Sequence, residues 1–178
     1  MRVIAGEFRS RILKTLPGLD TRPTPDRLRE SLFNVLAHEI EGAVFLDAYA
    51  GTGAVGIEGL SRGAQRAIFI EKSRAAAGVI RDNIKSLGLG PRAEILQGRV
   101  LQYLPQRPAG IVFLDPPYDL EKEYSEALLA LAATGTGLVI AQHSSRFQLE
   151  ERYESLERRR VLTQGENSLS FYRPVTPS

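Results

Sequence analysis

The feature that most constrains the fold is an alternation of short apolar runs and helical patterns that begins near residue 43. Each run is six or seven residues long and is followed by a stretch with helical spacing of apolar residues. This alternation is typical of a mostly parallel sheet covered by helices, so the sequence predicts an α/β fold. The expected strands are 43–48, 66–71, 93–98, 110–115 and 136–142, and the expected helices are 54–63, 73–87, 99–104 and 121–132.

The N-terminal end of the chain departs from this alternation. Residues 1–24 contain short apolar pieces broken by charges and by a Pro-Gly pair, which predicts a hairpin-like arm. Apolar residues at helical spacing then predict a helix over about 25–40. Thr24 is the expected N-cap of this helix, and Pro25 is its expected first residue.

The C-terminal end reads as a hairpin. Residues 152–164 and 168–174 flank a short polar turn, which predicts an antiparallel pair that closes one edge of the sheet and brings its strands to seven. The length of 178 residues fits one domain. Residues 1–40 are interpreted as an arm and helix that extend this domain, and residues 41–178 as its main, cofactor-binding part.

A glycine-rich segment, LDAYAGTGAVG, follows the first expected strand. Gly51, Gly53 and Gly56 form the pattern G-x-G-x-x-G between a strand and a helix, where small residues let a nucleotide-like cofactor approach the backbone. Asp47 precedes the glycines. Glu71 ends the second strand, 18 residues after Gly53, where a carboxylate can accept both hydroxyls of a ribose. The glycine pattern alone does not separate NAD from other nucleotide-like cofactors.

A second motif, Asp115-Pro116-Pro117-Tyr118, directly follows the fourth expected strand. The prolines have no N–H and stiffen the loop, so the loop offers carbonyl acceptors together with the Asp115 carboxylate and the flat ring of Tyr118. These groups suit a planar amine, whose two N–H groups would meet two acceptors while its ring stacks on Tyr118. Acceptors aimed at both hydrogens favour attack by the amine nitrogen.

Composition excludes several other kinds of site. The chain has no cysteine and two histidines, which excludes disulfides and thiolate zinc sites and argues against a multi-histidine metal centre. The longest apolar stretches are too short to span a bilayer, and the N-terminus has no signal-peptide core. We expect a cytoplasmic monomer with no metal and no membrane partner.

Several segments carry a family resemblance: MRVIAGEFRSR at the start, RPTPDRLRESLFNVL at 22–36, LDAYAGTGAVGIEGLSRGA at 46–64, and FLDPPY at 113–118. With them the chain resembles S-adenosylmethionine-dependent methyltransferases of the Rossmann-like fold. More closely, it is similar to the RsmD-type enzymes, which methylate N2 of a guanine in small-subunit ribosomal RNA. The resemblance covers nearly the whole chain.

The resemblance implies roles for individual residues. Asp115 and the Pro116 carbonyl would orient the amine, with Pro117 in the same loop and Tyr118 stacked on the guanine. The glycine loop would hold the methionine part of the cofactor, Glu71 the ribose, and Lys72 would flank the adenine. After the third strand many methyltransferases place an acid or amide that reads the adenine amine, but the segment Gln97-Gly98-Arg99-Val100 has no such acid, which leaves a backbone contact. The expected cofactor residues are Asp47, Ala50, Gly51, Thr52, Gly53, Glu71, Lys72, Gly98 and Arg99.

The basic N-terminal segment is the expected contact with RNA. Residues 1–30 carry seven basic and four acidic side chains, and phosphate contacts from such a segment position RNA without reading its sequence. The partner would be ribosomal RNA or a small-subunit assembly intermediate. The expected RNA-binding residues are Arg9, Arg11, Arg22, Thr24, Arg27 and Arg29. Alternatively, Arg22, Thr24 and Arg27 face the carboxylate of the cofactor.

Three other functions are compatible with parts of the sequence. A methyltransferase could act on another planar amine, such as adenine N6, cytosine N4 or a glutamine side chain, because the loop chemistry is nearly the same. An NAD(P)-dependent oxidoreductase would use the glycine pattern but would leave the Asp-Pro-Pro-Tyr motif unexplained. A non-catalytic RNA-binding module would have no use for that motif.

Overall fold

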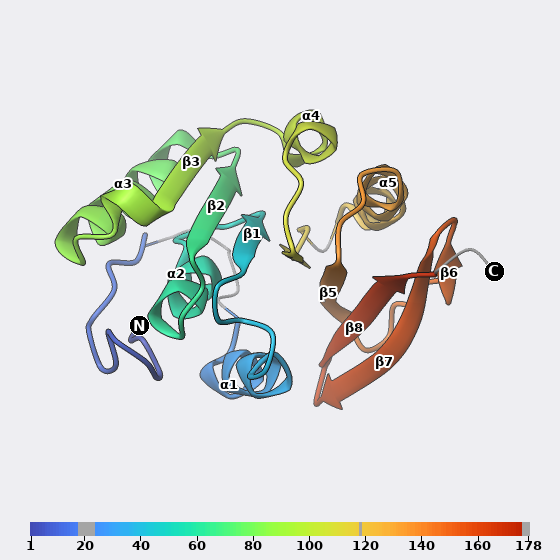
Figure 1. Ribbon diagram of the computed structural model, residues 1–178, viewed down its shortest axis with the longest axis horizontal. Helices are drawn as coiled ribbons and strands as arrows, with labels where there is room; N and C mark the ends of the chain where they lie inside the picture. Colours follow the sequence, from blue (N-terminus) through green and yellow to red (C-terminus); the bar gives the residue numbers. More distant parts are fainter. Residues whose placement is uncertain (18–23, 118, 176–178) are drawn as a thin grey trace.

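A computed structural model describes residues 1–17, 24–117 and 119–175. Their strands form one mixed sheet in the order β3-β2-β1-β4-β5-β8-β7-β6 (Figure 1). The parallel strands are β1 (Val44–Ala48), β2 (Arg66–Glu71), β3 (Ala93–Gln97), β4 (Ile111–Leu114) and β5 (Leu138–Ser144). The antiparallel strands are β6 (Arg152–Tyr153), β7 (Leu156–Gln164) and β8 (Asn167–Pro174). This arrangement confirms the predicted α/β fold.

Helices cover both faces of the sheet. The helices are α1 (Asp26–Val35), α2 (Ala54–Ser61), α3 (Arg74–Ser86), α4 (Val100–Tyr103) and α5 (Glu121–Ala132). The first three share one buried apolar cluster with the sheet, and α4 and α5 share the cluster on the opposite face. No helix in the described part of the chain is long and apolar enough to cross a membrane.

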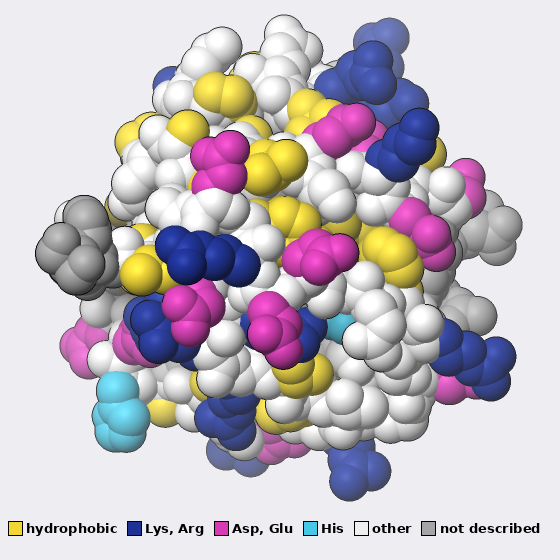
Figure 2. All heavy atoms as spheres, turned by 90° about the vertical axis from the view of Figure 1, so that its right-hand side faces the viewer, with side chains coloured by type: hydrophobic (Ala, Val, Ile, Leu, Met, Phe, Trp, Pro, Cys, Tyr) yellow, Lys and Arg dark blue, Asp and Glu magenta, His cyan; other side chains and the backbone are white. Residues whose placement is uncertain are grey.

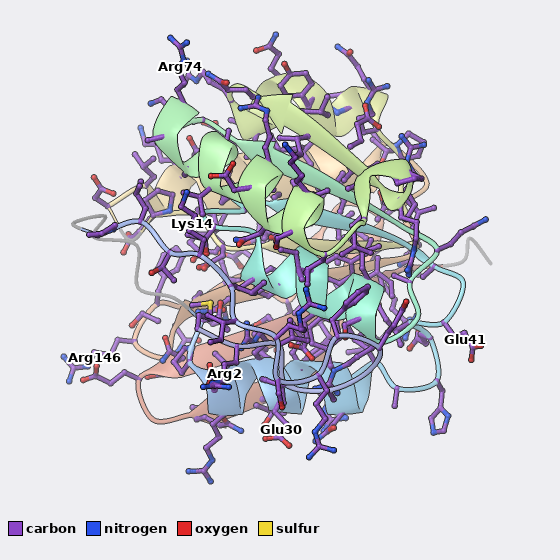
Figure 3. All side chains as sticks on the ribbon, turned by 90° about the vertical axis from the view of Figure 1, so that its left-hand side faces the viewer. Arg2, Lys14, Glu30, Glu41, Arg74 and Arg146 are labelled. Atoms are coloured by element: carbon purple, nitrogen blue, oxygen red, sulfur yellow. The ribbon has the colours of Figure 1, made fainter. Side chains whose placement is uncertain are left out.

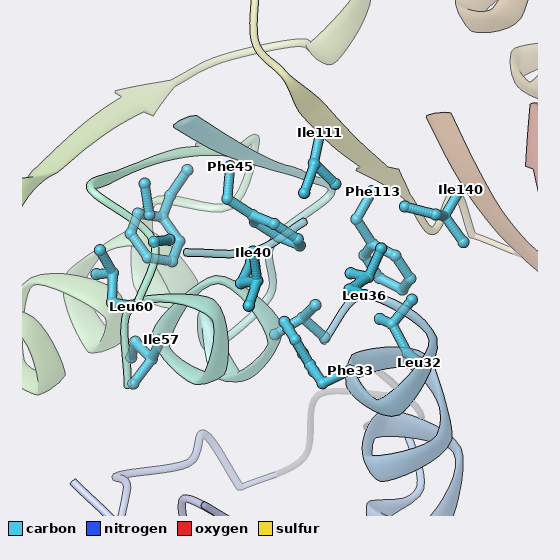
Figure 4. Packing of buried hydrophobic residues seen from close by; sticks show 14 of the residues in the cluster. Leu32, Phe33, Leu36, Ile40, Phe45, Ile57, Leu60, Ile111, Phe113 and Ile140 are labelled. Atoms are coloured by element: carbon cyan, nitrogen blue, oxygen red, sulfur yellow. The ribbon is translucent and has the colours of Figure 1, made fainter. Parts of the chain in front are cut away.

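Side chains of β1 alternate between these two clusters, as the pleat of a strand requires. Phe45 packs in the cluster of α1, α2 and α3, whereas Leu46 and Ala48 pack in the cluster of α4 and α5. Figure 4 shows Leu32 and Phe33 of α1 in the first of these clusters, beside the sheet residues that it labels. The alternation places Asp47 on the same face as Phe45, toward α2.

The C-terminal part of the sheet has one strand more than expected. The predicted single strand 152–164 bends at Glu154, whose backbone φ is 51°. Residues Arg152–Tyr153 therefore fold back on the start of β7 as the separate strand β6, and the sheet has eight strands among the described residues, not seven. The antiparallel pairing of β7 with β8 confirms the predicted hairpin.

The first helix differs from its prediction at both ends. It ends at Val35. Residues 36–39 form turns and residue 40 a bend, and both Leu36 and Ile40 stay buried, so their apolar spacing resembles that of a longer helix. Thr24 is not the N-cap, which is Pro25. The Thr24 hydroxyl donates instead to Oε1 of Gln142, at 3.0 Å, in β5.

The described part of the N-terminal arm, residues 1–17, is hairpin-like as predicted. Arg2 and Ile12 form an antiparallel bridge, and the N–H of Leu13 donates to the carbonyl of Met1 at 2.8 Å. Val3 and Leu13 are buried in the cluster that also holds α1 and α2. Figure 3 looks onto the side of the molecule that carries the arm, with Arg2 and Lys14 labelled.

Candidate functional site

The acidic residues predicted for the site gather at the carboxyl ends of the parallel strands. Chain order along the sheet reverses between β1 and β4, which lie side by side at its centre. Ligands of open α/β sheets bind in the crevice at such a reversal. Asp47 lies near the end of β1, Glu71 ends β2, and Asp115 directly follows β4, so the fold brings the three together.

The glycine loop between β1 and α2 is held open by its backbone geometry. Gly51 and Gly53 have φ values of 60° and 84°, a region that favours glycine. A Cβ built on Gly51 would meet no atom within 4 Å, whereas one on Gly56 would lie 2.4 Å from Cε1 of Phe69. Gly51 thus leaves room beside the backbone, and Gly56 lets α2 pack closely on β2.

Asp47 holds the glycine loop through a hydrogen bond to its backbone. Its Oδ2 accepts the N–H of Gly56, in the first turn of α2, at 2.9 Å. Burial raises the pKa of Asp47 well above its usual range, and the nearby acidic groups Asp115 and Glu71 add to the effect. Asp47 is 2% exposed, and its carboxylate contacts the backbone at the start of α2.

Glu71 also holds the glycine loop, through hydrogen bonds to backbone N–H groups. These contacts were not predicted from the sequence. Its Oε2 accepts the N–H of Gly51 at 2.7 Å, and its Oε1 accepts the N–H of Ser73 at 2.9 Å. One carboxylate therefore joins the glycine loop to the start of α3. Ala50 is attached to the same strand, because its N–H donates to the carbonyl of Ile70 at 2.9 Å. Lys72, next along the chain, is exposed.

Asp115 lies partly buried at the end of β4, where burial raises the pKa of its carboxyl to about 7. Pro116 is buried and Pro117 is exposed. The carbonyl of Pro117 accepts the N–H of Leu120 at 3.0 Å, which closes a turn before α5. Tyr118 lies outside the described residues, so its predicted stacking role stays a prediction.

The turn after β3 completes the strand-end site. The N–H of Gly98 donates to the carbonyl of Glu71 at 3.0 Å, and an added Cβ would lie 2.9 Å from Cε2 of Tyr103. Arg99 is exposed and precedes α4. A backbone contact from this turn to an adenine would have to use a group other than the Gly98 N–H.

The predicted RNA-binding residues fall into three groups. Arg9, Arg11 and Arg27 are exposed, as phosphate contacts require. Arg22 lies outside the described residues. Thr24 is buried against Gln142 in β5, and this removes its hydroxyl from the surface.

For Arg29 the expectation of an RNA contact is wrong. Its side chain is 0% exposed, and Nη2 donates to the carbonyl of Arg2 at 2.7 Å and to Asp26 at 3.2 Å. The buried Glu58 carboxylate lies 3.9 Å from its Nε. Arg29 thus joins α1 to the arm and to α2, and its burial lowers its pKa.

Two side chains at the site were missed by the sequence reasoning. Tyr49, in the left-handed backbone region at φ 61°, donates its hydroxyl to Glu123 in the first turn of α5. Asn83 is buried in α3 and contacts the glycine loop. The sequence carries one signal for Asn83, because it is a polar residue at helical spacing from the buried Ala76 and Ile80.

Comparison with solved structures relates this architecture to known proteins. The structure named "Putative methyltransferase yhhF from Escherichia coli" has a TM-score of 0.87 to this chain at 33% sequence identity. The match covers 98% of this chain and 97% of that protein. The fold is thus that of the Rossmann-like methyltransferase class.

Sequence relatives define the family more closely. "Putative rRNA methyltransferase YlbH" of Bacillus subtilis (strain 168) is 35% identical over 97% of this chain and 98% of its own length. "Ribosomal RNA small subunit methyltransferase D" of Escherichia coli (strain K12) is 42% identical over 66% of this chain and 60% of its own length. The family described as "Conserved hypothetical protein 95" matches residues 1–173. The chain belongs to this family, the RsmD type of methyltransferase.

Proposed function

We propose that this protein transfers a methyl group from S-adenosylmethionine to the exocyclic N2 amine of a guanine in small-subunit ribosomal RNA. The observation that carries the proposal is the placement of Asp115 and Pro116 directly after β4, beside the strand that leads into the glycine loop. The name of the Escherichia coli relative supports small-subunit ribosomal RNA as the substrate.

The residues around the glycine loop fit S-adenosylmethionine. The open space beside Gly51 lets a ligand approach the backbone. Each carboxylate oxygen of Glu71 accepts one backbone N–H, and a carboxylate oxygen has about two lone-pair sites, so acceptor capacity is left for ribose hydroxyls. Burial is the main cause of the raised pKa of Asp47, and repulsion from the nearby Asp115 and Glu71 adds to it; a positively charged ligand relieves such repulsion.

When bound, S-adenosylmethionine supplies a methyl group attached to a positively charged sulfur. The chain's own task is to hold the amine. The ionised carboxylate of Asp115 would accept one amine N–H and the Pro116 carbonyl the other, which directs the nitrogen lone pair away from both acceptors. The amine loses one proton for each methyl group that it gains. Asp115, with its pKa of about 7, is suited to receive that proton near neutral pH.

The exposed arginines of the arm and of α1 provide the proposed contact with RNA. Arg9 and Arg11 lie in the arm and Arg27 lies in the first turn of α1. Guanidinium groups make two-pronged contacts with phosphate. The target base would leave its stack to reach the strand-end site, which a loop guanine does at lower cost than a paired one.

Replacement of the target guanine by inosine tests the acceptor. The methylated position is first mapped by mass spectrometry on unmodified small-subunit RNA, and the RNA is then rebuilt with inosine there. Inosine lacks the N2 amine, so we expect no transfer at that position, while phosphate contacts preserve RNA binding. Asp115→Ala protein with the guanine RNA serves as the inactive control. Methylation of the inosine, or of an adenine or cytosine in unmodified RNA, would show that N2 of guanine is not the acceptor.

A further inference from the structure

The N-terminal arm is anchored on the two helices that form the cofactor site. Its backbone N–H groups at Ile4 and Ala5 donate to the buried carboxylate of Glu58, in α2, at 2.8 and 3.0 Å. The N–H of Phe8 donates to Oγ of Ser61, also in α2, at 3.0 Å. At Gly6 an added Cβ would lie 2.0 Å from the Ser61 carbonyl, so the two backbones are in close contact. The arm is therefore fixed to α2 by these contacts.

A second anchor joins the arm to the glycine loop through one side chain of α3. Oδ1 of Asn83 accepts the N–H of Lys14 at 2.8 Å, and Nδ2 donates to the Lys14 carbonyl at 3.1 Å. The same Nδ2 donates to the carbonyl of Thr52, at 3.2 Å. Asn83 is 2% exposed, and leaving such buried polar groups unpaired is costly.

Thr52, the residue of the glycine loop that Asn83 contacts, lies at the centre of the proposed cofactor site. Thr52 is between Gly51, whose N–H is held by Glu71, and Gly53, which precedes α2. On the arm side, the basic side chains also contact α3. Nζ of Lys14 lies 2.7 Å from Asp82, and Nη2 of Arg11 donates to the Ser86 carbonyl at 3.3 Å. A ligand on the arm and a ligand in the loop would thus order the same hydrogen-bonded unit.

We propose that Asn83 is a positioning residue that couples the arm to the glycine loop, so that RNA and the cofactor strengthen each other's binding. The inference rests on the proposed function, which places RNA on the arm and S-adenosylmethionine in the loop. Whichever ligand binds first fixes the geometry shared by Lys14 and Thr52, and the second ligand then loses less conformational freedom. Such coupling is reciprocal and typically changes affinity by about 5- to 150-fold.

Calorimetry on the full chain measures the coupling directly. The affinity for S-adenosylhomocysteine is determined with and without a saturating hairpin of the substrate RNA, for the wild type, Asn83→Asp and Asp82→Ala. Asn83→Asp can still accept the Lys14 N–H but donates to neither carbonyl. Asp82→Ala removes the exposed ion pair with Lys14 and leaves the side chain of Asn83 intact, so it is the matched control. We expect RNA to raise the affinity of the wild type and of Asp82→Ala by about 5- to 20-fold, and that of Asn83→Asp by less than about 2-fold.

Hydrogen exchange on the wild type alone provides a test that does not depend on folding of the variant. Saturating S-adenosylhomocysteine should slow exchange of the Lys14 amide by about 10-fold, although this amide belongs to the arm. The amide of Leu162, in the C-terminal hairpin, is the internal control. An unchanged Lys14 amide, or equal coupling in the wild type and Asn83→Asp, would overturn the inference. RNA that binds without changing cofactor affinity overturns the coupling alone, whereas absence of RNA binding overturns the proposed function as well.

Discussion

Asp115 is the side chain on which the proposed chemistry depends most directly. Its carboxyl must be ionised to accept an amine N–H, and burial raises its pKa to about 7. The methylation rate at saturating substrate should therefore rise with pH through about 7 and level off above it. Asp115→Ala should lower this rate by at least ~10²-fold and abolish that rise, as expected for loss of a preorganised contact in the transition state.

The control for Asp115 is cofactor affinity. Binding of S-adenosylhomocysteine by Asp115→Ala, measured by calorimetry, should stay within a few-fold of the wild type, because Asp115 is assigned to the amine. A variant that keeps more than half of the wild-type rate would remove Asp115 from the catalytic assignment.

Glu71 has two roles, since it accepts hydrogen bonds from the N–H groups of Gly51 and Ser73 and is proposed to bind the ribose. Glu71→Ala should weaken S-adenosylhomocysteine binding by ~1.5–3 kcal/mol, the range for hydrogen bonds to a charged group. Glu94→Ala is the matched control, because Glu94 lies on β3 and pairs with Arg66 and Arg107 at the surface. Equal calorimetric affinities for Glu71→Ala and Glu94→Ala would exclude Glu71 as a cofactor ligand.

The contact between helix α2 and strand β2 sets the position of the glycine loop. Gly56→Ala would place a Cβ 2.4 Å from the Phe69 ring, so the helix or the ring must shift. We expect the free energy of unfolding in urea to fall by ~1–3 kcal/mol, as for other overpacked sites.

Gly78→Ala is the comparison for this substitution. Gly78 lies inside α3 and an added Cβ would meet nothing within 4 Å, so alanine should raise the unfolding free energy by ~0.5–1 kcal/mol. If both substitutions changed stability equally, the close approach of α2 to β2 would not be what makes glycine necessary at position 56.

Most helices and strands could be predicted because the spacing of apolar residues that indicates them lies within each segment. The strand Arg66–Glu71 and the helix Glu121–Ala132 match their predicted ranges residue for residue. The errors have two causes, a contact that is remote in the chain and a local turn that the residue type disfavours. Thr24 has the sequence context of an N-cap, but its hydroxyl bonds to Gln142, 118 residues away. The extra strand β6 depends on a turn at Glu154, a residue that rarely adopts positive φ.

The candidate site, like the fold, could be predicted in part from the sequence. Asp47, Glu71 and Asp115 could be placed together because each stands at or near the end of a predicted strand, and parallel strands end at one edge. The burial of Arg29 could not be predicted, because arginine is rarely fully buried and its partner Glu58 lies in another helix. The loop contacts of Glu71 depend on backbone N–H groups, which carry no signal in the sequence.

At the scale of the whole molecule, the formal net charge of +2 is too small to attract RNA without a local concentration of basic groups. The C-terminal hairpin also carries exposed arginines, including Arg159 and Arg160 on β7. Figure 2 shows the side of the molecule that carries this hairpin, where basic and acidic side chains are interspersed. The arm and the hairpin thus both carry exposed arginines, and their contributions can be separated by experiment.

The salt dependence of RNA binding distinguishes the two regions. For single-stranded RNA, each phosphate contact adds about 0.7 to the slope of log affinity against log salt concentration. If Arg9 and Arg11 both contact phosphates, the double alanine variant should bind more weakly and its slope should fall by about 1.4, with RNA-free cofactor affinity unchanged. Arg159→Ala with Arg160→Ala is the control of equal charge, and it should keep the wild-type slope. An unchanged slope in the arm variant, together with a reduced slope in the control, would place the RNA across the hairpin and not along the arm.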